Sequence, residues 1–169
     1  MQLCSDKLND VLREVVILWN IKSFSELTPL ELYAIYELRV KTFVVEQKRV
    51  YQEVDQIDLN AVHIFKTINH KIVAYARVFK EDQHLSFGRV VVDRQLRGQH
   101  VGTELMTHIL NIAKTRFTGL NIQIEAQIQV QDFYKRFGFA TSGTPFIFHH
   151  TEHIKMLKSA LSTANSSAS

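Results

Sequence analysis

The spacing of apolar and polar residues predicts alternating strands and helices from residue 15 onward. An apolar run with an alternating tail predicts a first strand over 15–25. Thr28 is then followed by Pro29 and, three residues after the threonine, by an acid, which is a capping box with proline at the first helical position. Helical spacing continues from there to about Val44. The polar, acid-rich segment 46–60 is interpreted as a loop or a short irregular helix that faces solvent.

Three further strands or strand candidates follow in the middle of the chain. Apolar runs at 61–67 and 71–80 predict two strands joined by a tight turn at Asn69, since asparagine tolerates the backbone angles of such turns. A second polar turn leads to a strand at 85–93, which contains a β-branched run of three valines. We therefore expect this part of the sheet to be antiparallel.

The last third of the chain predicts a helix followed by a strand that runs parallel to the strand at 85–93. Apolar residues at helical spacing over 101–117 predict a helix that ends before Gly119, and residues 121–127 alternate as in a strand. The strands at 85–93 and 121–127 should be parallel because a helix crosses between them. The remaining elements are a short helix near 130–136 and strand candidates at 146–148 and 153–157.

Composition is that of one α/β domain with a sizeable core. The chain has 169 residues, of which 46% are apolar and 22% charged. Cys4 is the only cysteine, which excludes an intrachain disulfide and favours a cytoplasmic location. The apolar run at 15–19 is too short for a membrane span or a signal core. We expect an N-terminal extension at 1–14, the domain at 15–158 and a disordered tail at 159–169.

The segment FGRVVVDRQLRGQHVG, residues 87–102, joins an apolar strand to a basic, glycine-bearing turn at the start of a helix. A helix start exposes unpaired N–H groups and the positive end of the helix dipole, so it stabilises an anion such as pyrophosphate. Gly98 and Gly102 allow ligand and backbone to approach closely. The turn lacks the lysine of the triphosphate loop G-x-x-x-x-G-K-S/T and the three glycines of the dinucleotide turn G-x-G-x-x-G.

Residues 97–102, RGQHVG, resemble the acetyl-CoA turn of the GNAT acyltransferase superfamily, R/Q-x-x-G-x-G/A, with His100 in place of the internal glycine. A positive φ at that position would cost free energy in a histidine. The strand at 121–127 and the helix segment 133–139, FYKRFGF, match the family in order and spacing. Upstream residues resemble the ElaA-type branch of the superfamily. They are Leu38, Arg39, residues 43–47, Tyr51, Asp55, Asp58 and His63.

The resemblance implies an α/β (α+β mixed) GNAT fold and acetyl-CoA as the acyl donor. The fold is a mixed sheet of six or seven strands, flanked by helices and splayed between the strands at 85–93 and 121–127. The pantetheine arm would pair with strand backbone in the splay, the pyrophosphate would sit on the turn, and Arg94 or Arg97 would add charge. The implied cofactor contacts are Val90, Val91, Val92, Arg97, Gly98, Gln99, His100, Val101, Gly102, Thr103, Phe133 and Tyr134.

Transfer from a thioester to an amine needs an acid for the leaving sulfur and a base for the amine, which is mostly protonated at neutral pH. Following the family position, Tyr134 is our candidate acid, and amphipathic packing beside Phe133 is the alternative. Candidate bases are Glu125, Glu46 and His63. For each of these a structural role is favoured over catalysis: a solvated strand residue, a helix-end carboxylate and a core histidine. The acids Glu46, Glu53, Asp55 and Asp58 would either attract a cationic amine or form a solvated face.

The function implied is an N-acetyltransferase that transfers acetyl directly to a small-molecule or protein amine. The alternatives are a non-catalytic acyl-CoA-binding or sensing module and a donor longer than acetyl. Dimers are common among proteins of this resemblance, so a homodimer is one option. We expect neither a membrane nor a nucleic-acid partner, since the cations are scattered. We also expect no metal, because His149, His150 and His153 lie in a predicted strand segment without a cysteine or aspartate to complete a zinc site.

Overall fold

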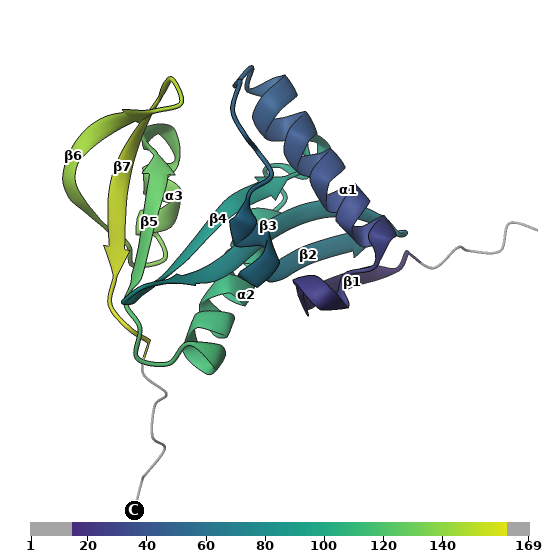
Figure 1. The fold of residues 1–169 in the computed structure, drawn as a ribbon, viewed down its shortest axis with the longest axis horizontal. Coiled ribbons are helices and arrows are strands. Elements are labelled where there is room, and N and C mark those ends of the chain that lie inside the picture. The colour runs from purple at the N-terminus through teal and green to yellow at the C-terminus, as the bar shows by residue number, and fades with distance from the viewer. Residues whose placement is uncertain (1–14, 162–169) are drawn as a thin grey trace, which may run out of the picture.

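In a computed structural model of the chain, which describes residues 15–161, seven strands form one sheet in the order β1-β2-β3-β4-β5-β7-β6 (Figure 1). All neighbouring strands are antiparallel except β4 and β5, which are parallel. The strands are β1 (Ile17–Ser23), β2 (Val62–Ile68), β3 (Lys71–Glu81), β4 (His84–Val92), β5 (Ile122–Gln127), β6 (Ala140–Phe148) and β7 (Thr151–Lys158). The helices are α1 (Pro29–Arg39), α2 (Val101–Arg116) and α3 (Gln131–Lys135). The predicted extension at 1–14 and most of the predicted tail, 162–169, lie outside the described residues.

Strands β4 and β5 diverge almost as soon as they meet, which confirms the predicted splay. Their register holds one pair, Leu85 opposite Ile122, and the Leu85 N–H donates to the Asn121 carbonyl at 2.9 Å. On the other side of β4, the N–H of Asp93 donates to a β3 carbonyl, that of Val73, at 2.8 Å. Backbone N–H and C=O groups alternate in direction along a strand, so those of residues 90 and 92 face β5. They have no hydrogen-bond partner in β5, because the two strands have already diverged there.

Helices cover both faces of the sheet and bury a separate apolar cluster on each. Helix α2 packs Leu105 and Ile109 against strands β2 to β5 on one face, and α1 packs Ile35 on the other (Figure 1). The alternation of side chains along β2 divides its residues between the two clusters, so that Ile64 faces α2 and Phe65 faces α1. The central strands β2 and β3 are therefore buried on both faces, and the splay between β4 and β5 opens the sheet to a ligand.

Helix α1 begins at the predicted capping box. Thr28 Oγ1 accepts the Glu31 N–H at 3.2 Å, and the Glu31 carboxylate accepts the Thr28 N–H at 2.9 Å. The helix does not end at Arg39, because the chain continues in π-helical turns over Val40–Glu46. Such wide turns are rare and are often found at functional sites. Here the segment 47–57, which follows these turns, lies at the opening of the splay.

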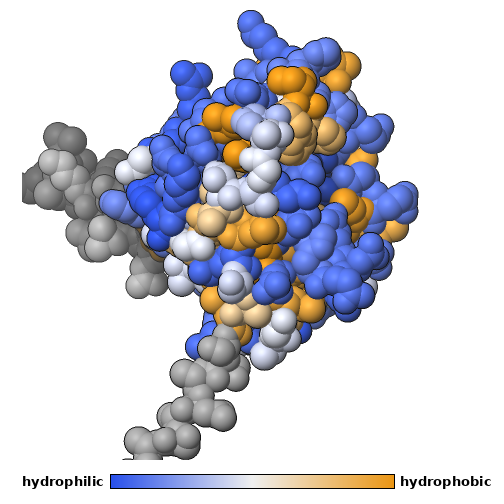
Figure 2. Space-filling model, turned by 90° about the vertical axis from the view of Figure 1, so that its left-hand side faces the viewer, coloured by the Kyte–Doolittle hydropathy of each residue, from blue (hydrophilic) through white to orange (hydrophobic). Residues whose placement is uncertain are grey.

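Seen from the side of β6, the surface is mainly hydrophilic, and apolar areas are separated by hydrophilic ones (Figure 2). Ile147 and Phe148 on this edge strand are among the exposed apolar residues. Among the described residues, no helix is long and apolar enough to span a membrane.

Candidate functional site

A cleft of about 770 Å³ opens where β4 and β5 separate. Residues 86–90 and Val92 of β4 form one wall, and 123–127 of β5 form the other. One part of the lining reaches the first turn of α2, at Gly102. The other part is closed by the segment 47–57 and by the turn between β6 and β7. The cleft thus connects a helix start to a group of polar and aromatic side chains on the far side of the splay.

The first turn of α2 is open toward the cleft. Gly102 lines it, and a Cβ at this position would lie at an ordinary contact distance, 3.6 Å, from the Phe133 ring. The first helical hydrogen bond at this end runs from the Glu104 N–H to the His100 carbonyl. The N–H groups of residues 101–103 consequently have no acceptor within the helix, and no side chain caps them. Gly98, Gln99, His100 and Thr103 are exposed around this turn, whereas Val101 is buried in the core.

His100 occupies the left-handed region, with φ 62° and ψ 1°. The position that holds glycine in the GNAT pattern thus has a positive φ in this chain, although it is occupied by histidine. We expect His100→Ala to be less stable than His100→Gly by about 1 kcal/mol, because alanine is strained where φ is positive. At exposed Thr107, within the same helix, the order should reverse, since glycine costs about 1 kcal/mol relative to alanine in a helix interior. Urea unfolding of the four variants measures both differences, and the same order at both positions would contradict the prediction.

Two of the three predicted valine contacts line the cleft, and the third does not. Val90 and Val92 line it, whereas Val91 is 3% exposed and packs in the α1 cluster. Arg97 also lines the cleft, where its Nε donates to the Val92 carbonyl at 3.1 Å. Its Nη2 lies 3.2 Å from the carboxylate of Glu46. These two residues border a second cavity of about 340 Å³, whose lining also includes Thr42, Gln47 and Arg94. The structure thus places Glu46 against the turn, not among the residues of the main cleft.

Tyr134 is 8% exposed and forms part of the cleft wall. Its ring packs against those of Phe87, Phe133 and Phe139, with centroids 5.3 to 6.1 Å apart. Burial raises the pKa of the phenol above its usual value of 10.0, so the group is protonated at neutral pH. Within the part of the chain that the structure describes, its hydroxyl makes no hydrogen bond. Tyr134 therefore packs in the core and also borders the cleft, and its role as the acid stays a prediction.

The candidate bases occupy different environments. Glu125 is exposed, lines the cleft and makes no ion pair with any described residue. His63 is fully buried away from the cleft lining. Its Nδ1 lies 2.8 Å from the Tyr75 hydroxyl and its Nε2 lies 2.9 Å from the Asp58 carbonyl oxygen. Burial lowers the pKa of His63, which keeps the imidazole neutral. The core-histidine interpretation fits this environment.

His153, which the sequence suggested only as a metal ligand, lies on the cleft. It is 5% exposed, and its Nδ1 lies 2.8 Å from the Thr151 carbonyl oxygen. Because a carbonyl only accepts hydrogen bonds, Nδ1 of a neutral imidazole carries the proton and Nε2 is left as the acceptor. Among residues 15–161, no group of three or more His, Cys, Asp or Glu side chains could hold a metal ion.

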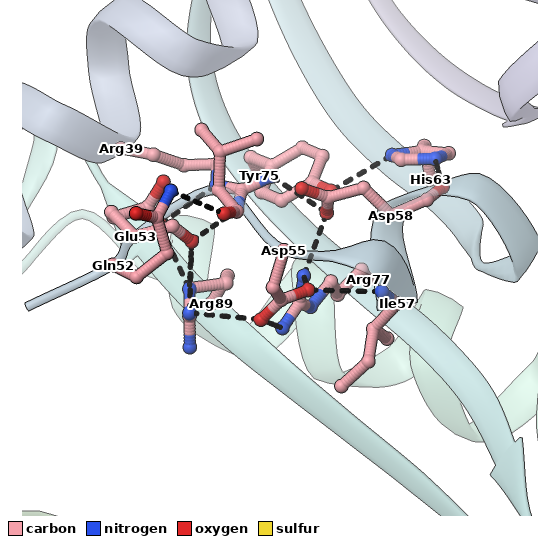
Figure 3. A network of polar contacts seen from close by, with 11 residues as sticks. Arg39, Gln52, Glu53, Asp55, Ile57, Asp58, His63, Tyr75, Arg77 and Arg89 are labelled. Carbon is pink, nitrogen blue, oxygen red and sulfur yellow. Dashed lines mark hydrogen bonds and ion pairs between the residues drawn. The ribbon is translucent and has the colours of Figure 1, made fainter.

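A largely buried network of ion pairs connects the segment 47–57 to α1 and β3 (Figure 3). Arg39 of α1 donates to Glu53 at 2.9 Å and to Asp58 at 2.8 Å. Arg77 of β3 donates to the same oxygen of Asp58 at 2.8 Å and to Asp55 at 2.6 Å. Glu53 and Asp58 are 5% and 1% exposed, so the prediction that 46–60 faces solvent is wrong for these residues.

The acids that the sequence suggested would either attract a cationic amine or form a solvated face are instead paired with arginines. Each of Glu46, Glu53, Asp55 and Asp58 has at least one arginine partner. Burial alone would raise the pKa of Asp58, but hydrogen bonds and charge from Arg39 and Arg77 outweigh it and hold the pKa below 3.8. Their negative charge is therefore neutralised within the protein, and little of it is left to attract a cationic amine.

Arg89 completes the network from a bulge in β4. Arg77 pairs with Gly88 and Tyr75 pairs with Val91, so two residues of β4 lie opposite one residue of β3. Arg89 adopts a φ of 53°, and such conformations in bulky residues are found preferentially at active sites. Its Nε lies 2.8 Å from Glu53 Oε1 and its Nη2 lies 3.3 Å from Asp55 Oδ2. The sequence signal that could have located the bulge is the glycine inside an apolar strand.

A family model described as an acetyltransferase (GNAT) domain matches residues 30–160 of the chain. Protein ElaA of Escherichia coli strain K12 is 40% identical over 129 residues, which cover 73% of this chain and 84% of that protein. A UPF0039 protein of Schizosaccharomyces pombe is 38% identical over 138 residues, which cover 80% of this chain and 92% of that protein.

Solved structures agree with these matches. An acyl-CoA N-acyltransferase from Pseudomonas aeruginosa superposes with a TM-score of 0.81 at 33% identity, covering 85% of this chain and all of that one. Escherichia coli ElaA superposes with a TM-score of 0.80 at 36% identity, covering 85% of this chain and 99% of that one. An aminoglycoside 6'-N-acetyltransferase complexed with coenzyme A shares the fold alone, with a TM-score of 0.66 at 14% identity over 83% of this chain and 96% of that one.

Proposed function

Because the chain belongs to the GNAT acetyltransferase family, we propose that it transfers an acetyl group from acetyl-CoA directly to an amine, of a small molecule or of a protein. The observation that carries the proposal is the splay, where unpaired strand backbone lies next to an open helix start. The backbone of Val90 and the N–H of Val92 would pair with the pantetheine arm, since the Val92 carbonyl already accepts from Arg97 Nε. The free N–H groups at residues 101–103, together with Arg97, would hold the pyrophosphate. The residues of the cleft thus fit acetyl-CoA in both polarity and order.

Tyr134 is the proposed acid for the leaving sulfur. In direct transfer the amine nitrogen bonds to the thioester carbon, the C–S bond breaks, and the sulfur takes a proton. Tyr134 is protonated at neutral pH because burial raises its pKa, and it lies on the wall of the cleft. A phenol so placed would supply that proton without a charged group entering the apolar splay.

Glu125 is the proposed base for the attacking amine. It lines the cleft opposite β4 and is not neutralised by any described cation. Among the three candidates from the sequence it has direct access to the cleft, since Glu46 pairs with Arg97 and His63 is buried. His153 is a second candidate, since its free Nε2 would accept a proton. The kcat values of Glu125→Gln and His153→Gln separate the two candidates, because loss of the base lowers kcat.

Purified protein mixed with acetyl-CoA and a panel of amines tests the proposal by release of free thiol. We expect Tyr134→Phe to lower kcat by about 100-fold, the contribution typical of a positioned acid. Affinity for acetyl-CoA should stay within about twofold, because the ring and its packing remain. Tyr33→Phe, at a tyrosine that is 67% exposed on α1, is the matched control and should leave kcat unchanged.

Two outcomes would count against the proposal in different ways. Full activity of Tyr134→Phe would remove this residue from the mechanism. Binding of acetyl-CoA by calorimetry without thiol release for any amine would instead favour the non-catalytic binding or sensing module.

A further inference from the structure

We infer that the amine acceptor also carries a carboxylate, which Arg49 and Arg89 bind beside the Tyr51 ring. The inference deepens the proposed function and rests on it for the identification of this part of the cleft as the acceptor side. All three residues line the cleft in the part closed by the segment 47–57. This part lies across the splay from the helix start assigned to the pyrophosphate.

Arg89 has one donor group left for a ligand. Its Nε and Nη2 are engaged by Glu53 and Asp55, including the Glu53 carbonyl oxygen at 2.9 Å from Nη2. Nη1 makes no hydrogen bond with any described residue, and Figure 3 shows this end nitrogen pointing away from both carboxylates. The network therefore fixes the guanidinium in place, and of its three nitrogens Nη1 remains available to a ligand. A positioned donor of this kind loses little freedom when it binds an anion.

Arg49 has no acidic partner among the described residues. Its Nη1 and Nη2 each lie 3.5 Å from a neutral oxygen, that of the Gln47 side chain and that of the Phe148 carbonyl. Its Nε is buried and makes no hydrogen bond. A buried donor without an acceptor costs free energy, and a charged one costs more. A carboxylate in the cleft would give the Arg49 guanidinium the acidic partner that it lacks among the described residues.

The charges around Tyr51 leave an excess of one cation. Arg39, Arg77 and Arg89 balance the three acids Glu53, Asp55 and Asp58, and Arg49 is additional. The guanidinium carbons of Arg49 and Arg89 each lie 5.3 Å from the centroid of the Tyr51 ring. Because Arg89 is already paired with Glu53 and Asp55, the unbalanced positive charge at this ring is that of Arg49, and a ligand anion would balance it. A carboxylate has two oxygens, so it can accept from Nη1 of Arg89 and from the Arg49 guanidinium at the same time.

The opposite wall of the cleft carries the complementary charge. Glu125 on β5 has no cationic partner among the described residues and is the proposed base for the amine. An acceptor with an ammonium group toward Glu125 and a carboxylate toward the arginines would meet opposite charges at both ends. A polyamine would instead bring positive charge to Arg49 and Arg89, and the arrangement opposes that class of acceptor.

Binding of matched compounds tests the inference without relying on turnover. Protein saturated with coenzyme A is titrated by calorimetry with linear amino acids of increasing chain length. The same is done with their carboxamides, their phosphonate analogues and diamines of equal length. We expect the best amino acid to bind about 10- to 100-fold more tightly than its carboxamide, the range for a hydrogen bond to a charged group. Arg49→Gln should reduce this ratio by about tenfold, because one of the two arginines is lost and Arg89 remains. Lys48→Gln removes the same charge from an exposed neighbour that does not line the cleft, and should preserve the ratio.

The outcomes separate the site from the reaction. Equal affinity for amino acid and carboxamide, no binding by any amino acid, or a preference that Arg49→Gln leaves undiminished overturns the inference. Tighter binding of a phosphonate or a diamine also overturns the assignment of a carboxylate. Amino acids that bind as expected but release no thiol from acetyl-CoA contradict the proposed function and leave the carboxylate site standing. Acetylation of uncharged amines and diamines, with no gain from a carboxylate, supports the function and overturns the inference.

Discussion

Gly102→Glu is expected to weaken acetyl-CoA binding at least about 100-fold while the fold persists. The new carboxylate would stand at the start of α2, where the proposed pyrophosphate binds, and like charges in contact cost several kcal/mol. The side chain would also extend past the Phe133 ring and Val92, which lie 3.6 and 4.0 Å from the position of a Cβ at residue 102. The helix itself should tolerate the change, because an acid in the first turn is favourable with respect to the helix dipole.

Calorimetry with acetyl-CoA measures the loss, and two variants control for its causes. Gly102→Ala adds a methyl group at ordinary contact distance from Phe133, so it should bind nearly as well as the unchanged protein. Thr107→Glu adds the same charge at an exposed position further along α2 and should leave affinity intact. Circular dichroism and the unfolding midpoint report on the fold. Unchanged affinity in Gly102→Glu would show that the phosphates bind elsewhere.

Much of the fold follows from the sequence because its signals are local. The capping box at Thr28 and the helical spacing of α2 depend only on neighbouring residues, and the structure confirms both. The parallel relation of β4 and β5 follows from the helix between them. Strand β6 was predicted only at its end, since residues 140–145 lack alternation and include a glycine and a proline. There the strand exists because β7 offers a pairing partner, which no local pattern reveals.

The acceptor side of the cleft could not be predicted from the sequence for a physical reason. An acid such as Asp58 has the same polarity whether it faces water or a buried arginine. Its environment is decided by Arg39, which lies 19 residues before it in α1, and by Arg77, which lies 19 residues after it in β3. The role of Arg89 depends on the bulge, and that of Arg49 on a contact with Phe148, which is 99 residues away. These distances in sequence are bridged only by the complete sheet.

Arg39→Ala is expected to lower the free energy of unfolding by about 3 kcal/mol at neutral pH. Arg39 is fully buried and donates to Glu53 and Asp58, and breaking a buried ion pair from one side costs about 3 to 5 kcal/mol. The lower end of the range applies because Arg89 still pairs with Glu53, and Arg77 still pairs with Asp58. Lys22→Ala, which breaks the partly exposed pair with Glu31, is the control and should cost at most about 1 kcal/mol.

The loss of unfolding free energy caused by Arg39→Ala should depend on pH, and it should be smaller in acid than at neutral pH. The native pKa of Asp58 lies below its usual value of 3.8, so its pairing stabilises the fold fully above that pH. This contribution is lost as the pH falls through the native pKa, because protonated Asp58 no longer attracts the arginines. The difference in unfolding free energy between the unchanged protein and Arg39→Ala should therefore be largest at neutral pH and shrink below about pH 4. Urea unfolding between pH 3 and pH 7 measures it. The guanidinium carbon of Arg39 also lies 5.1 and 5.4 Å from the ring centroids of Tyr36 and Tyr75. A difference that stays constant across that pH range would mean that Arg39 stabilises the fold by this packing and not by its charge.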